Sequence, residues 1–253
     1  MKVPENLARK FLYYPDRLPP DMPPPRWAGG AEEVWMECDD GVNIHGLWWP
    51  EPQGAPVILF LHGNAQEVYS WSLVHEELAT TGCRLLLIDF HGYGKSGGVP
   101  HEAGLYLDGK AALGWLRERD VGDSDIVVFG KSLGGGVACE IARGRQFKTL
   151  VLESTFTSLA SVARNLFPFL PKGVPLGEAY DSISKLPQAR SPVLVIHGER
   201  DELIPVSEGQ ALFDAAPEAK EFYLVPGAGH NDVSLVAGPE YARRIATFLG
   251  VSP

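Results

Sequence analysis

Short apolar runs alternate with amphipathic helical segments along most of the chain, and this alternation most constrains the fold. The apolar runs are strand candidates at residues 57–61, 85–89, 126–129, 150–152, 193–197 and 222–225. The helix candidates between and after them cover residues 73–81, 105–119, 133–143, 206–216 and 239–249. Strands that are apolar throughout and separated by helices predict an α/β fold whose parallel sheet is covered by helices on both faces.

The residues before this alternation predict an antiparallel hairpin. Residues 34–38 and 43–49 are joined by Asp39-Asp40-Gly41, a strong turn signal. Together with the six parallel strands, this hairpin predicts a mostly parallel eight-stranded sheet in one domain spanning residues 1–253. Six prolines between residues 15 and 25 predict that residues 1–30 form an extended N-terminal strap. Residues 153–190 interrupt the alternation and are expected to form a short cap over the carboxyl edge of the sheet, where such folds bind ligands.

The composition and the absence of certain motifs predict which partners and cofactors the protein has and where it is located. The net charge of −10 argues against nucleic acid. Three well-separated cysteines predict free thiols, and the absence of an apolar run of about 18 residues or a signal sequence predicts a cytoplasmic protein without a transmembrane segment. The apolar cluster at residues 11–14 is expected to pack on the domain core, with contact to a membrane surface or an acyl chain as the alternative. No motif for zinc or a dinucleotide is found, so we expect no metal or cofactor. The oligomeric state is not predicted.

Two segments fit the pattern Gly-x-Ser-x-Gly, which marks a reactive serine on a sharp strand-to-helix turn. Ser132 follows the apolar strand candidate 126–129 and precedes the helix candidate 133–143. Ser96 lies well after its strand candidate, and Gly97, Gly98 and Pro100 would end a helix there. We therefore expect Ser132 to be the nucleophile and Ser96 to lie in a loop.

Both segments also contain Gly-Lys-Ser, the end of a phosphate-binding loop. That loop needs a further glycine five positions before the glycine of Gly-Lys. Asp125 and Asp89 stand at those positions. A carboxylate there would repel phosphate, so the sequence argues against nucleotide binding.

A serine hydroxyl needs a histidine as general base and a carboxylate that orients the histidine. His230 follows the last strand candidate and is flanked by small residues, and Asp201 follows the strand candidate 193–197. This order, serine then acid then histidine, is the one expected when all three emerge at the carboxyl edge of such a sheet. Glu153 is the alternative acid. His197 is expected to hydrogen-bond internally, whereas the others are expected at the surface: His45, His75, His91 and His101.

The negative oxygen of the tetrahedral intermediate needs hydrogen-bond donors. The backbone N–H of Leu133 opens the helix after Ser132 and is expected to be one donor. The loop Leu61-His62-Gly63-Asn64-Ala65 follows the first parallel strand, and the N–H of Asn64 is expected to be the second. Lys131 precedes the nucleophile and is expected to be a solvated lysine, with an influence on leaving groups or anionic substrates as the alternative.

Five motifs in this order resemble the α/β-hydrolase superfamily. They are His62-Gly63-Asn64-Ala65, the segment from Asp89 to Ser96, the segment from Gly130 to Gly135, His197-Gly198-Glu199-Arg200-Asp201, and Gly229-His230. The His-Gly-Asn-Ala loop and the basic residue before the serine are similar to the branch that contains depalmitoylase-like proteins and bacterial esterases. The resemblance implies Ser132 as nucleophile, Asp201 as acid, His230 as base, and Asn64 and Leu133 as backbone donors.

Together these features predict a serine hydrolase that cleaves carboxylic esters or thioesters of small-molecule acyl substrates without a cofactor. Four apolar residues of the cap-like segment are expected to bind small to medium acyl chains: Phe156, Leu166, Phe167 and Phe169. A serine peptidase and a perhydrolase would share the same three residues. A hydrolase-fold binding protein without turnover is the alternative from another class, although such a protein should have lost one of Ser132, Asp201 or His230.

Overall fold

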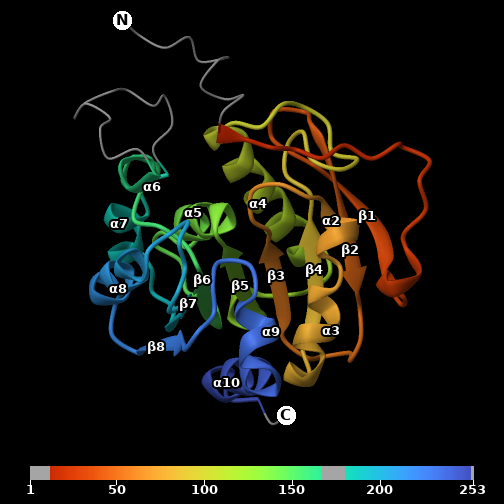
Figure 1. Cartoon of the computed structure of the whole chain (residues 1–253). Coiled ribbons are helices and arrows are strands. Elements are labelled where there is room, and N and C mark those ends of the chain that lie inside the picture. Colours follow the sequence, from red (N-terminus) through yellow and green to blue (C-terminus); the bar gives the residue numbers. More distant parts are fainter. Residues whose placement is uncertain (1–11, 167–179, 252–253) are drawn as a thin grey trace, which may run out of the picture.

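The computed structural model describes residues 12–166 and 180–251 and contains one eight-stranded sheet (Figure 1). The spatial order of the strands is β1-β2-β4-β3-β5-β6-β7-β8. The strands are β1 (Glu32–Glu37), β2 (Asn43–Trp49), β3 (Val57–Leu61), β4 (Arg84–Ile88), β5 (Ile126–Lys131), β6 (Thr149–Glu153), β7 (Val193–Gly198) and β8 (Lys220–Val225).

Strand β2 runs antiparallel to both of its neighbours, β1 and β4, whereas β3 to β8 are all parallel. The predicted α/β-hydrolase fold with its N-terminal antiparallel hairpin is therefore confirmed. Strand β3 pairs with β4 on one side and with β5 on the other. The chain thus changes its winding direction between β3 and β5, and crevices outside the carboxyl ends of such strands are where open α/β sheets bind ligands.

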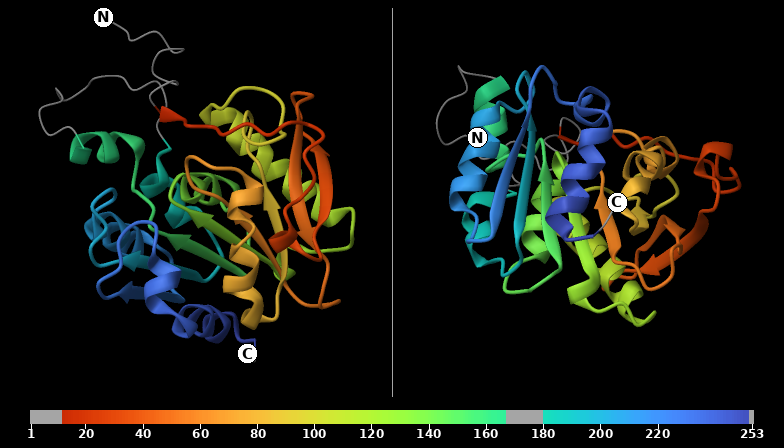
Figure 2. Two further views of the ribbon diagram at one scale, coloured as in Figure 1. Left: turned by 45° about the vertical axis from the view of Figure 1, so that its right-hand side comes forward. Right: turned by 90° about the horizontal axis from the view of Figure 1, so that it is seen from below.

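Helices cover both faces of the sheet (Figure 2). Alternate strand residues point to opposite faces, so the apolar strands supply two separate cores. Helices α4 (Glu102–Arg117), α5 (Leu133–Ile141) and α8 (Val206–Ala215) contribute to the core that contains Leu59 and Val128. Helices α3 (Val74–Leu78), α9 (Val233–Ala237) and α10 (Pro239–Leu249) contribute to the core that contains Phe60 and Phe129.

The predicted helix at residues 73–81 is found as two consecutive short elements over residues 74–81, but the helical turn before it was not predicted. The structure has three short elements in this region: α2 (Val68–Trp71), α3 and η2 (Ala79–Thr81). The carboxylate of Glu67 accepts hydrogen bonds from the N–H groups of Tyr69 and Ser70 and so caps α2. This cap starts a separate helical turn earlier than hydrophobic spacing indicates.

The N-terminal strap, residues 12–25, is extended and lies along the carboxyl edge of the sheet (Figure 1, red). Its backbone pairs with the loop that follows β4. Leu18 N–H donates to the carbonyl of Gly94 at 3.0 Å, and Gly94 N–H donates to the carbonyl of Asp16 at 2.7 Å. Arg17 extends this contact by donating to the carbonyl oxygens of Ser96 and Gly98.

Two helices occupy the described parts of the segment between β6 and β7: α6 (Leu159–Leu166) and α7 (Ser182–Lys185). Phe167 and Phe169, expected in the acyl pocket, lie outside the described residues. Among the helices within residues 12–166 and 180–251, none combines the length and the hydropathy that crossing a bilayer requires.

Candidate active site

Ser132 lies on a strained turn between β5 and α5. Its backbone angles are φ 51° and ψ −114°, in a region that residues with a side chain seldom adopt. The serine N–H donates to the carbonyl of Glu153 at 2.9 Å, and Thr155 Oγ1 donates to the serine carbonyl at 2.6 Å. These hydrogen bonds to the neighbouring strand and the loop after it hold the turn.

Two glycines of the motif are required by close packing. A Cβ on Gly134 would overlap the carbonyl oxygen of Leu61 at the end of β3. A Cβ on Gly130 would lie 2.6 Å from the carbonyl oxygen of Gly134. Both distances are shorter than van der Waals contact, so α5 can follow β5 this closely only where these side chains are absent.

Ser96, the other serine in a Gly-x-Ser-x-Gly pattern, is buried in a loop. Its Oγ accepts a hydrogen bond from the N–H of His45 at 2.9 Å and donates to the carbonyl of Asp89 at 2.8 Å. The hydroxyl therefore ties the loop after β4 to β2.

The structure brings Ser132, His230 and Asp201 together at the carboxyl edge of the sheet. The distance from His230 Nε2 to Ser132 Oγ is 3.1 Å, and the distance from His230 Nδ1 to Asp201 Oδ2 is 2.8 Å. His230 lies on the loop after β8 and Asp201 on the loop after β7. The three side chains thus form a continuous hydrogen-bonded chain from hydroxyl to imidazole to carboxylate.

Asp201 is held as a carboxylate by its surroundings. Its Oδ1 accepts hydrogen bonds from the N–H groups of Leu203 at 3.0 Å and Ile204 at 2.8 Å. Burial by itself would raise the pKa of this carboxyl, but the hydrogen bonds from His197, His230 and Ile204 outweigh burial and hold the pKa well below its usual range. His197 Nε2 also donates to the carbonyl of Ile204 at 2.9 Å. The expected internal hydrogen bond of His197 is thus confirmed.

Glu153, the alternative acid, pairs with other partners. Its carboxylate accepts hydrogen bonds from Lys131 and from the hydroxyl of Tyr241. The prediction of a solvated Lys131 is wrong, because the residue is 7% exposed and forms an ion pair with the fully buried Glu153. Lys131 ends β5, and its side chain lies on the face of the sheet that α10 covers. The hydropathy of its neighbours in sequence does not indicate that a buried carboxylate lies there.

Asn64 and Leu133 lie beside Ser132, where all three line one cavity. No described residue accepts a hydrogen bond from the backbone N–H of Asn64 or Leu133. The side chain of Asn64 fixes its loop: Oδ1 accepts from Tyr14 N–H at 3.1 Å and from the Tyr93 hydroxyl at 2.7 Å, while Nδ2 donates to the carbonyl of Leu12 at 2.7 Å. The N-terminal strap is thereby attached to the rim of the site.

The cavity that contains Ser132 is apolar and has a volume of about 580 Å³. It is called the apolar cavity below. Phe156 and Leu166, two of the four residues expected to bind the acyl chain, line it. Leu12 and Tyr14 also line it, where the alternative of contact with an acyl chain placed the cluster at residues 11–14. The apolar lining further includes residues that sequence reasoning missed: Leu159, Val162, Leu203 and Ile204.

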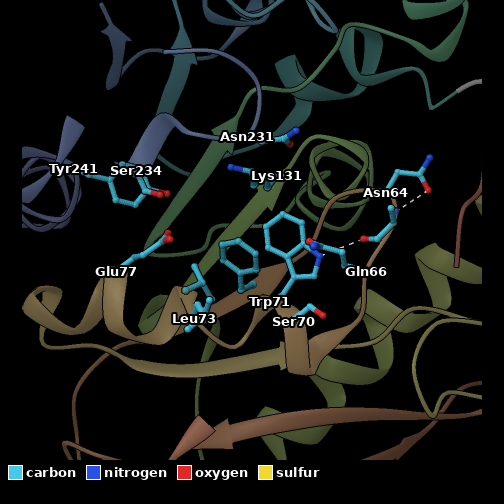
Figure 3. Close-up of a pocket in the computed structure, with 13 residues that line it drawn as sticks. Asn64, Gln66, Ser70, Trp71, Leu73, Glu77, Lys131, Asn231, Ser234 and Tyr241 are labelled. Atoms are coloured by element: carbon cyan, nitrogen blue, oxygen red, sulfur yellow. Dashed lines mark hydrogen bonds between the residues drawn. The ribbon is translucent and has the colours of Figure 1, made fainter. Parts of the chain in front are cut away.

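A second cavity of about 530 Å³ also includes Asn64 in its lining, which mixes polar and apolar side chains and is more polar than that of the first cavity (Figure 3). It is called the polar cavity below. Lys131 and Asn231, the neighbours in sequence of Ser132 and His230, both line it. Its other lining residues are Phe60, Ala65, Gln66, Ser70, Trp71, Leu73, Val74, Glu77, Ser234 and Tyr241.

The expectation that His45 and His91 lie at the surface is wrong. Both are buried, His45 fully and His91 to within 1%. His45 Nδ1 lies 3.1 Å from Asp89 Oδ2 and its Nε2 lies 2.9 Å from Glu33 Oε1, and His91 Nδ1 hydrogen-bonds to Asp108. Their carboxylate partners come from other elements, so their burial is decided by the tertiary structure.

One cluster in the described part of the chain has side chains of the kind that bind metals. Cys38, His91 and Asp108 place ligand atoms within 4.8 Å of one another. Cys38 Sγ donates to Asp108 Oδ1 at 3.3 Å, and the same oxygen binds His91. Burial and the charge of Asp108 raise the pKa of the Cys38 thiol far above its usual value, so the geometry is that of a hydrogen-bonded cluster with a protonated thiol.

Comparison with known proteins agrees with this architecture. The family model described as the alpha/beta hydrolase fold matches residues 56–179. The uncharacterized protein Rv2307c of Mycobacterium tuberculosis is 36% identical to this chain over 244 residues, which cover 95% of this chain and 86% of that protein. The chain belongs to the α/β-hydrolase family.

This α/β hydrolase also has named eukaryotic relatives and a similar solved structure. Alpha/beta hydrolase domain-containing protein WAV2 of Arabidopsis thaliana is 32% identical over 241 residues, covering 86% of this chain and 78% of that protein. Alpha/beta hydrolase domain-containing protein 17C of Xenopus tropicalis is 36% identical over 200 residues, covering 78% and 63%. The structure of the esterase Pf2001 of Pyrococcus furiosus superposes with a TM-score of 0.76 at 24% identity, covering 93% of this chain and 98% of that one, and thus shares the fold.

Proposed function

We propose that this α/β hydrolase is a serine hydrolase that cleaves carboxylic esters, and thioesters by the same chemistry, of small to medium acyl chains. The observation that carries the proposal is the hydrogen-bonded chain Ser132–His230–Asp201, with distances of 3.1 Å and 2.8 Å, whose serine lines an apolar cavity. The pattern matches the arrangement that activates a serine hydroxyl in unrelated hydrolases.

The first half of the reaction transfers the acyl group to the enzyme. Ser132 Oγ attacks the carbonyl carbon while His230 Nε2 takes the hydroxyl proton, and Asp201 stabilises the imidazolium that forms. The negative charge moves to the carbonyl oxygen, which accepts hydrogen bonds from the N–H groups of Asn64 and Leu133. The bond to the leaving oxygen then breaks, His230 gives its proton to that oxygen, and the alcohol departs from the acyl-enzyme.

Water completes the second half. It attacks the acyl carbon while His230 Nε2 takes one of its protons, and the second tetrahedral intermediate is again stabilised by the N–H groups of Asn64 and Leu133. The bond to Ser132 Oγ breaks, Oγ recovers a proton from His230, and the carboxylic acid leaves. Every proton is carried by side chains of this chain, so the proposed cycle requires no cofactor.

A series of p-nitrophenyl esters of increasing chain length, with fluorophosphonate labelling, tests the proposal. We expect the wild-type protein to hydrolyse the esters and to be labelled, and Ser132→Ala to lose kcat by a factor on the order of 10⁶ together with its labelling. Ser96→Ala, the variant at the other motif serine, should keep its labelling. Labelling that survives Ser132→Ala and disappears in Ser96→Ala would contradict the assignment of the nucleophile.

A further inference from the structure

Two cavities of different polarity lie beside the candidate active site. The apolar cavity is lined by Ser132 and Leu133, and the polar cavity by Lys131 and Asn231. Asn64 lines both. An ester has two arms joined at its carbonyl group, so this arrangement gives each arm a different environment.

We propose that the polar cavity is the subsite for the leaving alcohol, and that it takes an uncharged polyhydroxylated alcohol, a glycerol or sugar unit. The inference rests on the proposed function, because it assigns the second arm of the ester to be cleaved at Ser132. It therefore names the substrate class as acyl esters of neutral polyols.

The residue next to the base supports an assignment of the two arms of the ester. The leaving oxygen must lie within hydrogen-bond reach of His230 Nε2 to receive its proton. Asn231, the next residue along the chain, lines the polar cavity, whereas the apolar lining beyond Leu133 comes from Phe156, α6, the strap, and Leu203 and Ile204 in the loop after β7. The apolar cavity therefore suits the acyl arm and the polar cavity the alcohol arm.

The charges around the polar cavity select against an anionic alcohol. Lys131 is the one cation in its lining, and the carboxylate of Glu153 neutralises it. Glu77 also lines the cavity, and its carboxyl group supplies no positive charge that would attract an anion. No lining residue offers a free positive charge to a phosphate group.

Uncharged hydrogen-bonding groups line the same cavity. The side-chain amides of Gln66 and Asn231 have no hydrogen-bond partner among the described residues, so both can bind hydroxyl groups. Trp71 is held in place because its indole N–H donates to the carbonyl of Ala65 at 3.3 Å, and Figure 3 shows its ring in the middle of the lining. An aromatic face beside amide groups matches a polyol, which presents both C–H and O–H surfaces.

Three esters with one acyl chain test the inference. Hydrolysis of 1-octanoylglycerol, 1-octanoylglycerol 3-phosphate and ethyl octanoate is measured, and each kcat/KM is divided by the rate of alkaline hydrolysis of that ester. We expect the glycerol ester to exceed both of the others by about tenfold or more, because two or more hydrogen bonds to hydroxyl groups each contribute a factor of about 3 to 10. An equal or higher value for the phosphate ester would overturn the subsite.

Variants test whether Gln66 and Asn231 act on the alcohol arm alone or on the hydrolysis of every ester. Gln66→Ala and Asn231→Ala should each lower the preference for octanoylglycerol over ethyl octanoate by about 3- to 10-fold. Gln210→Ala, at an exposed glutamine on α8 that lines neither cavity, is the matched control and should leave the preference unchanged. Loss of both rates in equal proportion in Gln66→Ala and Asn231→Ala would overturn the subsite.

The same assays distinguish the two proposals. Hydrolysis of ethyl octanoate without any preference for the glycerol ester would overturn the subsite and leave the serine-hydrolase function standing. Hydrolysis of none of the three esters, together with no fluorophosphonate labelling of Ser132, would overturn the proposed function and the subsite with it.

Discussion

Replacement of Lys131 by methionine should destabilise the protein strongly. Lys131 is 7% exposed and its partner Glu153 is fully buried, so Lys131→Met leaves a buried carboxylate without its cation. Methionine has a similar length and fills the same space, so altered packing should contribute little to the loss of unfolding free energy. Removing one partner of a buried ion pair costs about 3–5 kcal/mol of unfolding free energy.

The hydroxyl of Tyr241 moderates this loss without removing it. Burial and the charge of Glu153 raise the pKa of Tyr241 well above its usual value, so the hydroxyl keeps its proton and donates to Glu153. One neutral donor does not replace an ammonium group. In the double variant Lys131→Met/Glu153→Gln, the amide oxygen can still accept from Tyr241 and no charge is buried, so we expect most of the lost stability to return.

Urea unfolding followed by tryptophan fluorescence measures these free energies, since the chain has six tryptophans. For a chain of this size, 3–5 kcal/mol corresponds to a fall in Tm of roughly 6–20 °C. The double-mutant cycle should give a coupling energy above about 2 kcal/mol. A loss below 1 kcal/mol in Lys131→Met, or equal losses in the single and double variants, would show that the pair is solvated and refute the reasoning.

Two further predictions concern Asp201 and His91. Asp201→Asn keeps the size of the side chain but removes the carboxylate that orients His230, and kcat for a p-nitrophenyl ester should fall by a factor on the order of 10⁴; a fall below tenfold would argue against Asp201 as the acid. Burial alone would lower the pKa of His91, but the hydrogen bonds and charges of Asp108 and Asp40 outweigh burial and raise the pKa. The ion pairs of His91 therefore stabilise the fold most below pH 6.5, the ordinary pKa of histidine. This contribution is lost as pH rises through the raised pKa. His91→Gln should therefore lower the unfolding free energy more at pH 5.5 than at pH 9, and equal losses in urea unfolding at the two pH values would contradict this sign.

Most of the sheet could be predicted from local pattern. Strand β3 was predicted with its exact bounds, as was α10, because continuous apolar runs and one-sided apolar spacing are properties of neighbouring residues. Helix α2 at residues 68–71 was not predicted, because a side-chain cap at Glu67 starts this separate helical turn. Capping depends on one side chain, and hydrophobic spacing does not record it.

For the candidate site, too, local sequence predicted some features and not others. The order of Ser132, Asp201 and His230, each just after a strand candidate, was enough to predict that they meet, because parallel strands end at one edge of the sheet. The environment of Lys131 was not predictable, since its partner Glu153 lies 22 residues away in the chain, and Tyr241, which donates to Glu153, lies 88 residues from that partner. The burial of His45 and His91 escaped prediction for the same reason.

The sequence by itself determined the parallel sheet, the turn that carries Ser132 and the edge at which His230 and Asp201 arrive. Only the tertiary structure decided what surrounds them: the strap residues Leu12 and Tyr14 in the wall of the apolar cavity, and the neutralised Lys131 in the wall of the polar cavity. The physical reason is the separation along the chain of the residues that interact. Strand and turn formation follow from steric and hydrophobic preferences within a few residues, whereas burial, pairing and cavity shape depend on segments that meet only after the chain has folded.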